Sequence, residues 1–249
     1  MCANQYENVY ANSQKDPKRP KTIAIIPAFN EEGKIGWVVE RAVKHQPALL
    51  DTVLVLIDNK TTDNSAGEAE EKGAFVIRNA GDGVGSVLKT GLRYALEKDM
   101  EICVLIAGDA QDDPAELPNL IYPIVHEGFD FVQGSRYLDG QRTVDMPLIR
   151  AILTRIYTLG FRAVTGFPAT DASNGFRALR LSNLKKINLW QKGLDKYGLE
   201  NFLFAQTIKR KFKIKEVPVT KRFDRKQGYS HMNLLIDHSF WSVIKGRIE

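Results

Sequence analysis

Three short polar segments hold the side chains of this sequence that could bind a metal ion or a phosphorylated ligand. Each follows an apolar run directly, and they are Pro27-Ala28-Phe29-Asn30-Glu31, Asp58-Asn59-Lys60-Thr61-Thr62-Asp63 and Asp109-Ala110-Gln111-Asp112-Asp113. Any one of them alone would favour a plain turn, because Asn and Asp side chains bond their own backbone. Mg²⁺ and Mn²⁺, however, are bound by such oxygens together with substrate phosphates. Three such segments in one chain favour a nucleotide cleft with a divalent metal site.

The apolar runs before these segments are predicted to be β-strands that alternate with helices. Strands are expected over residues 22–27, 52–57, 74–77 and 102–107, and helices over residues 34–44, 65–72 and 88–97. This alternation predicts βαβ units and a parallel sheet, in which ligands bind at the carboxyl ends of the strands. We therefore expect the three polar segments to meet at one edge of the sheet.

The remaining chain predicts further elements and three regions. A helix is expected over residues 114–127, a strand over 129–134, an amphipathic helix over 147–164, an edge strand over 213–219 and a last amphipathic helix over 232–247. Residues 1–20 have little to bury and end in a basic run with prolines, which predicts a flexible arm. One α/β domain is expected over residues 21–231. Residues 232–249 are compatible with a membrane interface or with ordinary packing.

Composition narrows the class of protein. A chain of 249 residues with 43% hydrophobic content is long enough for one large domain. The net charge of +5 suits an anionic partner, which could be nucleic acid, a membrane surface or a phosphate-bearing substrate. Two cysteines give no disulfide framework, so we expect a reducing compartment. No apolar run approaches the ~20 residues that cross a bilayer, so membrane contact is expected to be peripheral or supplied by a partner.

A glycine-rich stretch, Gly81-Asp82-Gly83-Val84-Gly85-Ser86, invites comparison with two phosphate-binding loops. A dinucleotide fingerprint would follow the first strand rather than the third, and its last glycine is missing here. A P-loop would need glycine in place of Leu88, before Lys89-Thr90. We therefore expect neither NAD nor a P-loop nucleotide at this stretch.

Five ordered motifs resemble those of family 2 glycosyltransferases, and within them the dolichyl-phosphate mannose and glucose synthases, over about residues 22–232. They are Ile26-Pro27-Ala28-Phe29-Asn30-Glu31-Glu32, Asp109-Ala110-Gln111, Gly134-Ser135-Arg136-Tyr137, Asp171-Ala172-Ser173-Asn174-Gly175-Phe176-Arg177 and Lys215-Glu216-Val217-Pro218-Val219. The resemblance implies a GT-A fold: a mostly parallel sheet with helices on both faces, a Rossmann-like nucleotide-binding half and an acceptor-binding half. It also implies an inverting transfer from GDP-mannose or a UDP-hexose to a polyprenyl or dolichyl phosphate. Such an enzyme would work at the cytoplasmic membrane surface, without nucleic acid.

The resemblance also implies roles on the donor side. The residues that would hold the nucleoside are Pro27, Ala28, Asn30, Glu31, Asp58 and Asn59. Asp109 and Gln111 would ligate Mg²⁺ or Mn²⁺ on the donor diphosphate. The family usually has Asp-Asp-Gly-Ser where this chain has Asp58-Asn59-Lys60-Thr61, and Ala107 stands in place of the first Asp of Asp-x-Asp. Asp112 or Asp113 could compensate for Ala107, or phosphate and water could.

On the acceptor side, the resemblance implies that Arg150, Thr154 and Arg225 bind the acceptor phosphate, with Arg136 in the same basic pocket. A phosphate monoester is already anionic at neutral pH and requires no strong base. Asp171 or Glu200 would serve as the base if the acceptor were a saccharide or protein hydroxyl. A degenerate nucleotide-binding module without activity is a third possibility.

Residues 147–164 raise a further question about the acceptor side. An apolar stripe at helical spacing is punctuated by Arg150, Arg155 and Arg162, and consists of Leu148, Ile149, Ile152, Leu153, Ile156 and Leu159. Periodicity alone fits a core-facing helix with a solvated basic face. The resemblance instead implies a helix at the membrane surface.

Overall fold

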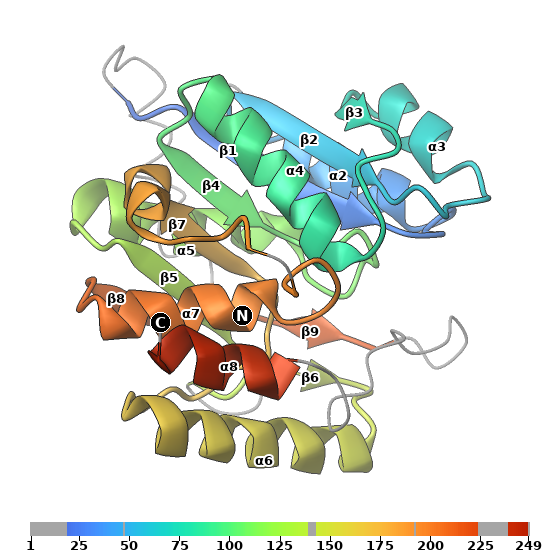
Figure 1. The fold of residues 1–249 in the computed structure, drawn as a ribbon. Helices are drawn as coiled ribbons and strands as arrows, with labels where there is room; N and C mark the ends of the chain where they lie inside the picture. The colour runs from blue at the N-terminus through green and yellow to red at the C-terminus, as the bar shows by residue number, and fades with distance from the viewer. Residues whose placement is uncertain (1–18, 47, 139–142, 192, 224–238, 249) are drawn as a thin grey trace.

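The computed structural model describes residues 19–46, 48–138, 143–191, 193–223 and 239–248, and a seven-stranded sheet forms the centre of this part of the chain (Figure 1). The strand order is β3-β2-β1-β4-β7-β5-β8. The strands are β1 (Thr22–Ala28), β2 (Thr52–Ile57), β3 (Phe75–Ile77), β4 (Ile102–Leu105), β5 (Phe131–Ser135), β7 (Arg177–Arg180) and β8 (Ile214–Pro218). Only β7 is antiparallel to its neighbours among these described strands, so the sheet is mostly parallel as predicted.

Helices cover both faces of the sheet because side chains alternate along each strand. Ile23 and Ile25 of β1 belong to one core cluster, and Ala24 and Ile26 belong to another on the opposite face. The first face is covered by α4 (Val84–Glu97), α6 (Leu148–Thr165), α7 (Leu199–Lys209) and α8 (Ser239–Ile248). The second face is covered by α2 (Ile35–Val43), α3 (Ser65–Glu71) and α5 (Leu117–His126).

Shorter elements complete the described structure. A small second sheet pairs β6 (Thr143–Val144) with β9 (Lys221–Arg222) in parallel. Two 3₁₀ helices are η1 (Pro114–Glu116) and η2 (Leu181–Lys186). The first of them precedes α5, so the single helix predicted over residues 114–127 is divided into two elements.

Besides the short elements β6, β9 and η2, one strand of the main sheet and one of its covering helices were not predicted, and other boundaries moved by a few residues. β7 and α7 lie in a stretch for which the pattern gave no element. The strand predicted over 102–107 ends at Leu105, and the helix predicted over 88–97 begins at Val84. Of the helix predicted over residues 232–247, the structure describes only the part from Ser239 onward. Arg19, at the end of the predicted arm, forms a two-pronged ion pair with Asp51 at 2.9 and 2.7 Å.

The apolar stripe of α6 faces outward rather than into the core. Its most exposed members are Leu148, Ile149 and Leu159, which are 75%, 72% and 66% exposed. The opposite face of α6 buries Thr154, Tyr157 and Phe161. The interpretation of the stripe as core-facing is therefore wrong, because the core contacts come from the other side of the helix.

α8 packs one face against α7 and leaves another in solvent. Val243 is fully buried, and a Cβ on Gly246 would lie 3.0 Å from both the Ala205 Cβ and the Phe202 carbonyl oxygen. Trp241, in contrast, is 71% exposed. Figure 1 shows α6 at the outer border of the molecule, beside α8. Among the described residues, no helix is both long enough and apolar enough to cross a bilayer.

Candidate active site

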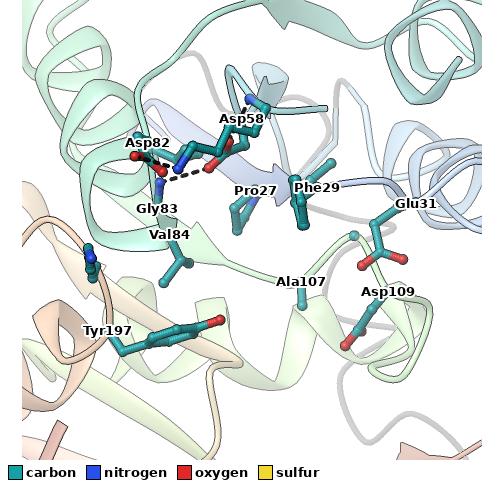
Figure 2. Close-up of a pocket in the computed structure, with 15 residues that line it drawn as sticks. Pro27, Phe29, Glu31, Asp58, Asp82, Gly83, Val84, Ala107, Asp109 and Tyr197 are labelled. Carbon is teal, nitrogen blue, oxygen red and sulfur yellow. Dashed lines mark hydrogen bonds and ion pairs between the residues drawn. The ribbon is translucent and has the colours of Figure 1, made fainter. Parts of the chain in front are cut away.

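A cleft of about 390 Å³ opens where β1, β2 and β4 end, and all three predicted polar segments contribute to it (Figure 2). Its lining residues from those segments are Pro27, Ala28, Phe29, Glu31, Asp58, Lys60 and Asp109. Further residues come from the turn before α4, from Ala107 and Gly108, and from Lys196 and Tyr197 ahead of α7. The prediction that these segments meet at one sheet edge is therefore confirmed.

Asp58 joins the second polar segment to the glycine-rich turn. Its carboxylate accepts hydrogen bonds from the Lys60 backbone N–H at 2.9 Å and from the Gly83 backbone N–H at 2.8 Å. The side chain is only 8% exposed, and Figure 2 shows it at the upper wall of the cleft. A carboxylate fixed in this way can accept further hydrogen bonds from a ligand without reorganising.

Asn30 and Asn59 support the cleft without lining it. Asn30 has a left-handed backbone with φ 53°, and its Oδ1 accepts a hydrogen bond from the Thr62 backbone N–H at 2.9 Å. The Asn59 backbone N–H donates to the Gly81 carbonyl oxygen at 3.0 Å. These two predicted nucleoside ligands connect the loops to each other in this structure.

Asp109 and Glu31 form the acidic end of the cleft, where Figure 2 shows both carboxylates. Burial raises the pKa of Glu31, the ion pair with Lys34 at 2.9 Å opposes that rise, and the nearby charge of Asp109 adds to it. The Asp109 carboxylate accepts a hydrogen bond from the Gln111 backbone N–H at 3.1 Å. Two negative side chains so close together attract a cation.

The residues present fit a divalent cation held mainly by its substrate. No group of three or more His, Cys, Asp or Glu side chains suited to a metal occurs among the described residues. Gln111 is 8% exposed, however, and its buried Oε1 has no hydrogen-bond partner in the structure. Mg²⁺ is typically bound through one or two carboxylates plus phosphates and water. Asp109 with the Gln111 oxygen meets that requirement.

The Asp113 carboxylate is engaged elsewhere, whereas Asp112 keeps a buried Oδ1 that has no hydrogen-bond partner in the described part of the structure. Asp113 caps η1 and pairs with Arg41 at 3.0 Å. Asp112 is fully buried and pairs with Lys221 of β9 at 2.9 Å. Burial raises the pKa of Asp112, and Lys221 opposes that rise. The pair ties the loop that carries Asp109 to the chain after β8.

Arg136 and Asp171 form a buried, bidentate ion pair. Arg136 Nε and Nη2 donate to the two Asp171 oxygens at 2.6 and 2.7 Å, and the Arg136 backbone N–H adds a third bond at 3.1 Å. Arg136 is 2% exposed and Asp171 is fully buried. Burial alone would raise the pKa of Asp171, but the charge of Arg136 holds it below its ordinary value. Asp171 is therefore not placed to take a proton from an acceptor.

The last three sequence motifs lock together around this pair. The Glu216 carboxylate on β8 accepts hydrogen bonds from the Thr170 and Asp171 backbone N–H groups at 2.8 and 3.1 Å. The Ser135 and Thr170 hydroxyls lie 2.6 Å apart. The three motifs at residues 134–137, 171–177 and 215–219 are thus joined by hydrogen bonds, and we call them the interlocked unit.

Tyr137 connects that unit to α6. Its hydroxyl lies 2.5 Å from the Thr154 hydroxyl, and the guanidinium groups of Arg136 and Arg155 lie 5.5 and 5.1 Å from its ring centre. Thr154 is only 1% exposed, so a bound acceptor phosphate would not touch it directly in this structure. Arg150 stacks over the Phe223 ring at 5.0 Å. Arg225 lies outside the described residues.

Glu200 lies in the first turn of α7, partly exposed. Burial raises its pKa, and the charges of Arg177 and Lys221 oppose that rise. Its Oε1 lies 3.0 Å from where a Cβ on Gly175 would be. Of the two carboxyls predicted as possible bases, Glu200 is the one whose proton affinity is raised.

Four residues around the site were missed by sequence reasoning: Asp82, Lys196, Tyr197 and Lys221. Asp82 lies in the glycine-rich stretch and forms an ion pair at 2.8 Å with Lys60, which also lines the cleft. The other three lie in irregular stretches or in a two-residue strand, where no periodic pattern marks them. Only their position in the fold brings them to the site.

Comparison with known proteins identifies the class to which this fold and cleft belong. Glucosyl-3-phosphoglycerate synthase of Mycobacterium tuberculosis aligns with a TM-score of 0.72 and 21% identity over 95% of this chain and 82% of that one. The same enzyme with Mn²⁺, UDP and glucosyl-3-phosphoglycerate aligns with a TM-score of 0.69 and 19% identity, over 91% and 78%. The fold is that of the GT-A glycosyltransferases.

Comparison of the sequence with family models identifies the family. Residues 23–187 match the model of glycosyl transferase family 2, so the chain belongs to that family and is a glycosyltransferase. An undecaprenyl-phosphate mannosyltransferase of Micrococcus luteus is 26% identical over 86% of this chain and 88% of that protein. A polyprenol monophosphomannose synthase of Mycolicibacterium smegmatis is 27% identical over 86% and 81%.

The free energy of unfolding is predicted to depend on pH through Glu116, the last residue of η1. Its carboxylate accepts hydrogen bonds from the Thr220 N–H and hydroxyl at 2.8 and 3.0 Å, and burial raises its pKa from 4.5 to about 7. The folded state keeps a proton that the unfolded state loses between these values, so the unfolding free energy falls as pH rises through this window. Across this window the unfolding free energy of the wild type falls by at most about 3 kcal/mol relative to that of the Glu116→Gln variant. Urea denaturation of both proteins at several pH values checks this, and parallel pH curves would contradict it.

Proposed function

We propose that the protein transfers a hexose from a nucleotide sugar to a polyprenyl phosphate at a membrane surface. The observation that carries this proposal is the exposed apolar face of α6, attached through the Thr154–Tyr137 contact to the interlocked unit beside the nucleotide cleft. Exposed apolar faces mark contacts with membranes or with other proteins, and a lipid acceptor would bring α6 to a membrane. Relatives named for undecaprenyl-phosphate and polyprenol substrates support the same acceptor class.

The donor lies in the cleft, with its nucleoside between the Pro27–Phe29 backbone and Asp58. Its diphosphate is directed to the acidic end, where Asp109 and Gln111 hold a Mg²⁺ or Mn²⁺ ion. When bound, this ion neutralises the charge that develops on the leaving diphosphate. Glu31 adds negative charge beside Asp109 and strengthens attraction for the cation.

The acceptor phosphate is the nucleophile, and Arg150 and Arg225 bind it. Arginine suits this task because its planar group bonds phosphate oxygens in pairs. The phosphate carries its own negative charge near neutral pH, so the protein has only to align it with the anomeric carbon. A single displacement inverts that carbon. Asp171 holds Arg136 in place, and Thr154 holds Tyr137, so both are positioning residues.

Binding to the membrane is peripheral and uses α6. Leu148, Ile149 and Leu159 enter the interface, while Arg155 and Arg162 on the same helix meet anionic head groups. The enzyme then takes its acceptor from the lipid surface and its donor from the cytoplasm.

Transfer to a saccharide or polypeptide hydroxyl is the second candidate, and the raised pKa of Glu200 favours it. A hydroxyl must lose its proton during transfer, and Glu200 would accept it. A phosphate acceptor needs no such base.

Asp109 is predicted to be essential for transfer. Purified protein with Mn²⁺, a short polyprenyl phosphate and a panel of UDP- and GDP-hexoses should form a glycolipid. Asp109→Asn should lower kcat by about 100-fold or more, because it removes charge next to the leaving group. Asp99→Asn is the control, since Asp99 is exposed and has a left-handed backbone that Asn tolerates. Absence of glycolipid with every donor would reject the proposed acceptor.

Glu200→Gln separates the two candidates in the same assay. With polyprenyl phosphate as acceptor, kcat should stay within about threefold of the wild type, because no proton is transferred. A loss of about 100-fold or more would instead support a hydroxyl acceptor.

Membrane binding is predicted to depend on the exposed face of α6. The double variant Ile156→Asp with Leu159→Asp should reduce co-sedimentation with anionic vesicles by about tenfold, because charged groups replace the apolar groups that enter the interface. Trp37→Asp, in the exposed part of α2, is the control and should bind as the wild type does. Equal binding of the double variant and the wild type would show that another surface meets the membrane.

A further inference from the structure

The chain segment 194–197 packs against the first turn of α4 more closely than side chains would permit. A Cβ on Gly85 would lie 2.0 Å from the Leu194 carbonyl oxygen and 2.7 Å from that of Lys196. Gly83 has φ +87°, and a Cβ there would lie 2.9 Å from the Asp195 carbonyl oxygen. The glycines that suggested a phosphate loop therefore make room for another part of the protein.

Hydrogen bonds fix this contact. The Gly85 N–H donates to the Lys196 carbonyl oxygen at 2.7 Å, and the Ser86 N–H donates to that of Asp195 at 2.6 Å. The first N–H groups of a helix lack partners within the helix and often bind phosphate. Here two of them bind carbonyl groups of the chain itself, so they are not available to a phosphate.

Lys89 holds the same segment by its side chain. Its ammonium lies 2.7 Å from an Asp195 carboxylate oxygen and 3.0 Å from the Gln191 carbonyl oxygen. Lys89 is only 7% exposed, and a buried ammonium is stable only with such partners. Leu194 is buried in the main core cluster and anchors the segment from the other side.

This anchoring brings two side chains to the nucleotide cleft. Lys196 and Tyr197 both line it, opposite the residues that follow β1 and β4. Figure 2 shows the Tyr197 ring along the lower side of the cleft, with its hydroxyl directed toward Ala107. Lys196 is exposed and, like Lys60, brings a positive charge to a cleft that also contains Glu31, Asp58, Asp82 and Asp109.

We propose that segment 194–197 is part of the donor site, with Lys196 and Tyr197 binding the nucleoside diphosphate sugar. Lys196 contacts the diphosphate, and the Tyr197 ring packs against the bound donor and closes its lower side. Lys89 is a positioning residue that fixes both through Asp195. The inference rests on the proposed function, because it concerns the same donor.

Titration calorimetry with UDP and with GDP, each with Mn²⁺, tests this inference. Whichever nucleotide the wild type binds, Tyr197→Ala and Lys196→Met should each weaken binding about tenfold, because the first loses the ring that packs against the donor and the second loses a charged contact to the diphosphate. Tyr122→Ala on α5 and the exposed Lys98→Met after α4 are matched controls that should bind as the wild type does.

The positioning role of Lys89 is tested by enzyme kinetics. Lys89→Met should raise the KM for the donor about tenfold with little change in kcat, because it loosens donor binding alone. Lys89→Arg, which keeps the charge, should restore much of the affinity. A lower thermal midpoint with unchanged nucleotide affinity would mean that Lys89 only stabilises the fold.

The outcomes separate the two proposals. If the wild type binds a nucleotide and Tyr197→Ala and Lys196→Met bind it as tightly as the controls do, segment 194–197 is not part of the donor site, and the proposed function stands. If the wild type binds neither UDP nor GDP, both proposals are overturned.

Discussion

The buried ion pair between Arg136 and Asp171 joins the end of β5 to the segment before its neighbouring strand β7. Arg136 follows β5, Asp171 precedes β7, and Glu216 on β8 fixes the backbone of Asp171. Loss of one partner would leave a buried charge uncompensated, at a cost of about 3–5 kcal/mol. The stacking of Arg136 on Tyr137 extends this connection to α6. The position of α6 therefore depends on a side-chain pair deep in the protein.

A second buried pair, Asp112 with Lys221, links the same region to the acidic end of the cleft. It joins the loop that carries Asp109 to β9, and the Arg222 backbone N–H adds a bond to the Gln111 carbonyl oxygen at 2.8 Å. Arg225 follows three residues after Arg222 in the sequence. The two buried pairs therefore hold the loop of Asp109, β9 and the end of β5 in one geometry.

Local patterns predicted the nucleotide half well, because its strands are apolar runs and each ends in a polar segment. β7 was missed since it is four residues long and has arginine at both ends. α7 was missed because seven of its residues are buried, so no polar face marks a period. For α6 the period was evident, but periodicity gives the position of a stripe and not the side on which the core lies.

The site residues also divide into those that a local sequence pattern marks and those that only the tertiary structure brings to the site. Asp58 and Asp109 were found because they follow strands directly. Arg136 and Asp171 were found only through family resemblance, and their pairing across 35 residues of sequence is a property of the fold. Lys221 and Tyr197 carry no local signal at all, since their importance comes from what the tertiary structure places beside them.

The central claim is a direct, inverting transfer to a lipid phosphate. NMR of the purified product, made from an α-linked nucleotide sugar and a polyprenyl phosphate, reports the anomeric configuration of the transferred sugar. An inverting transfer gives a β-linked sugar on the lipid phosphate. An α-linked product, or free sugar with unmodified lipid, would contradict it.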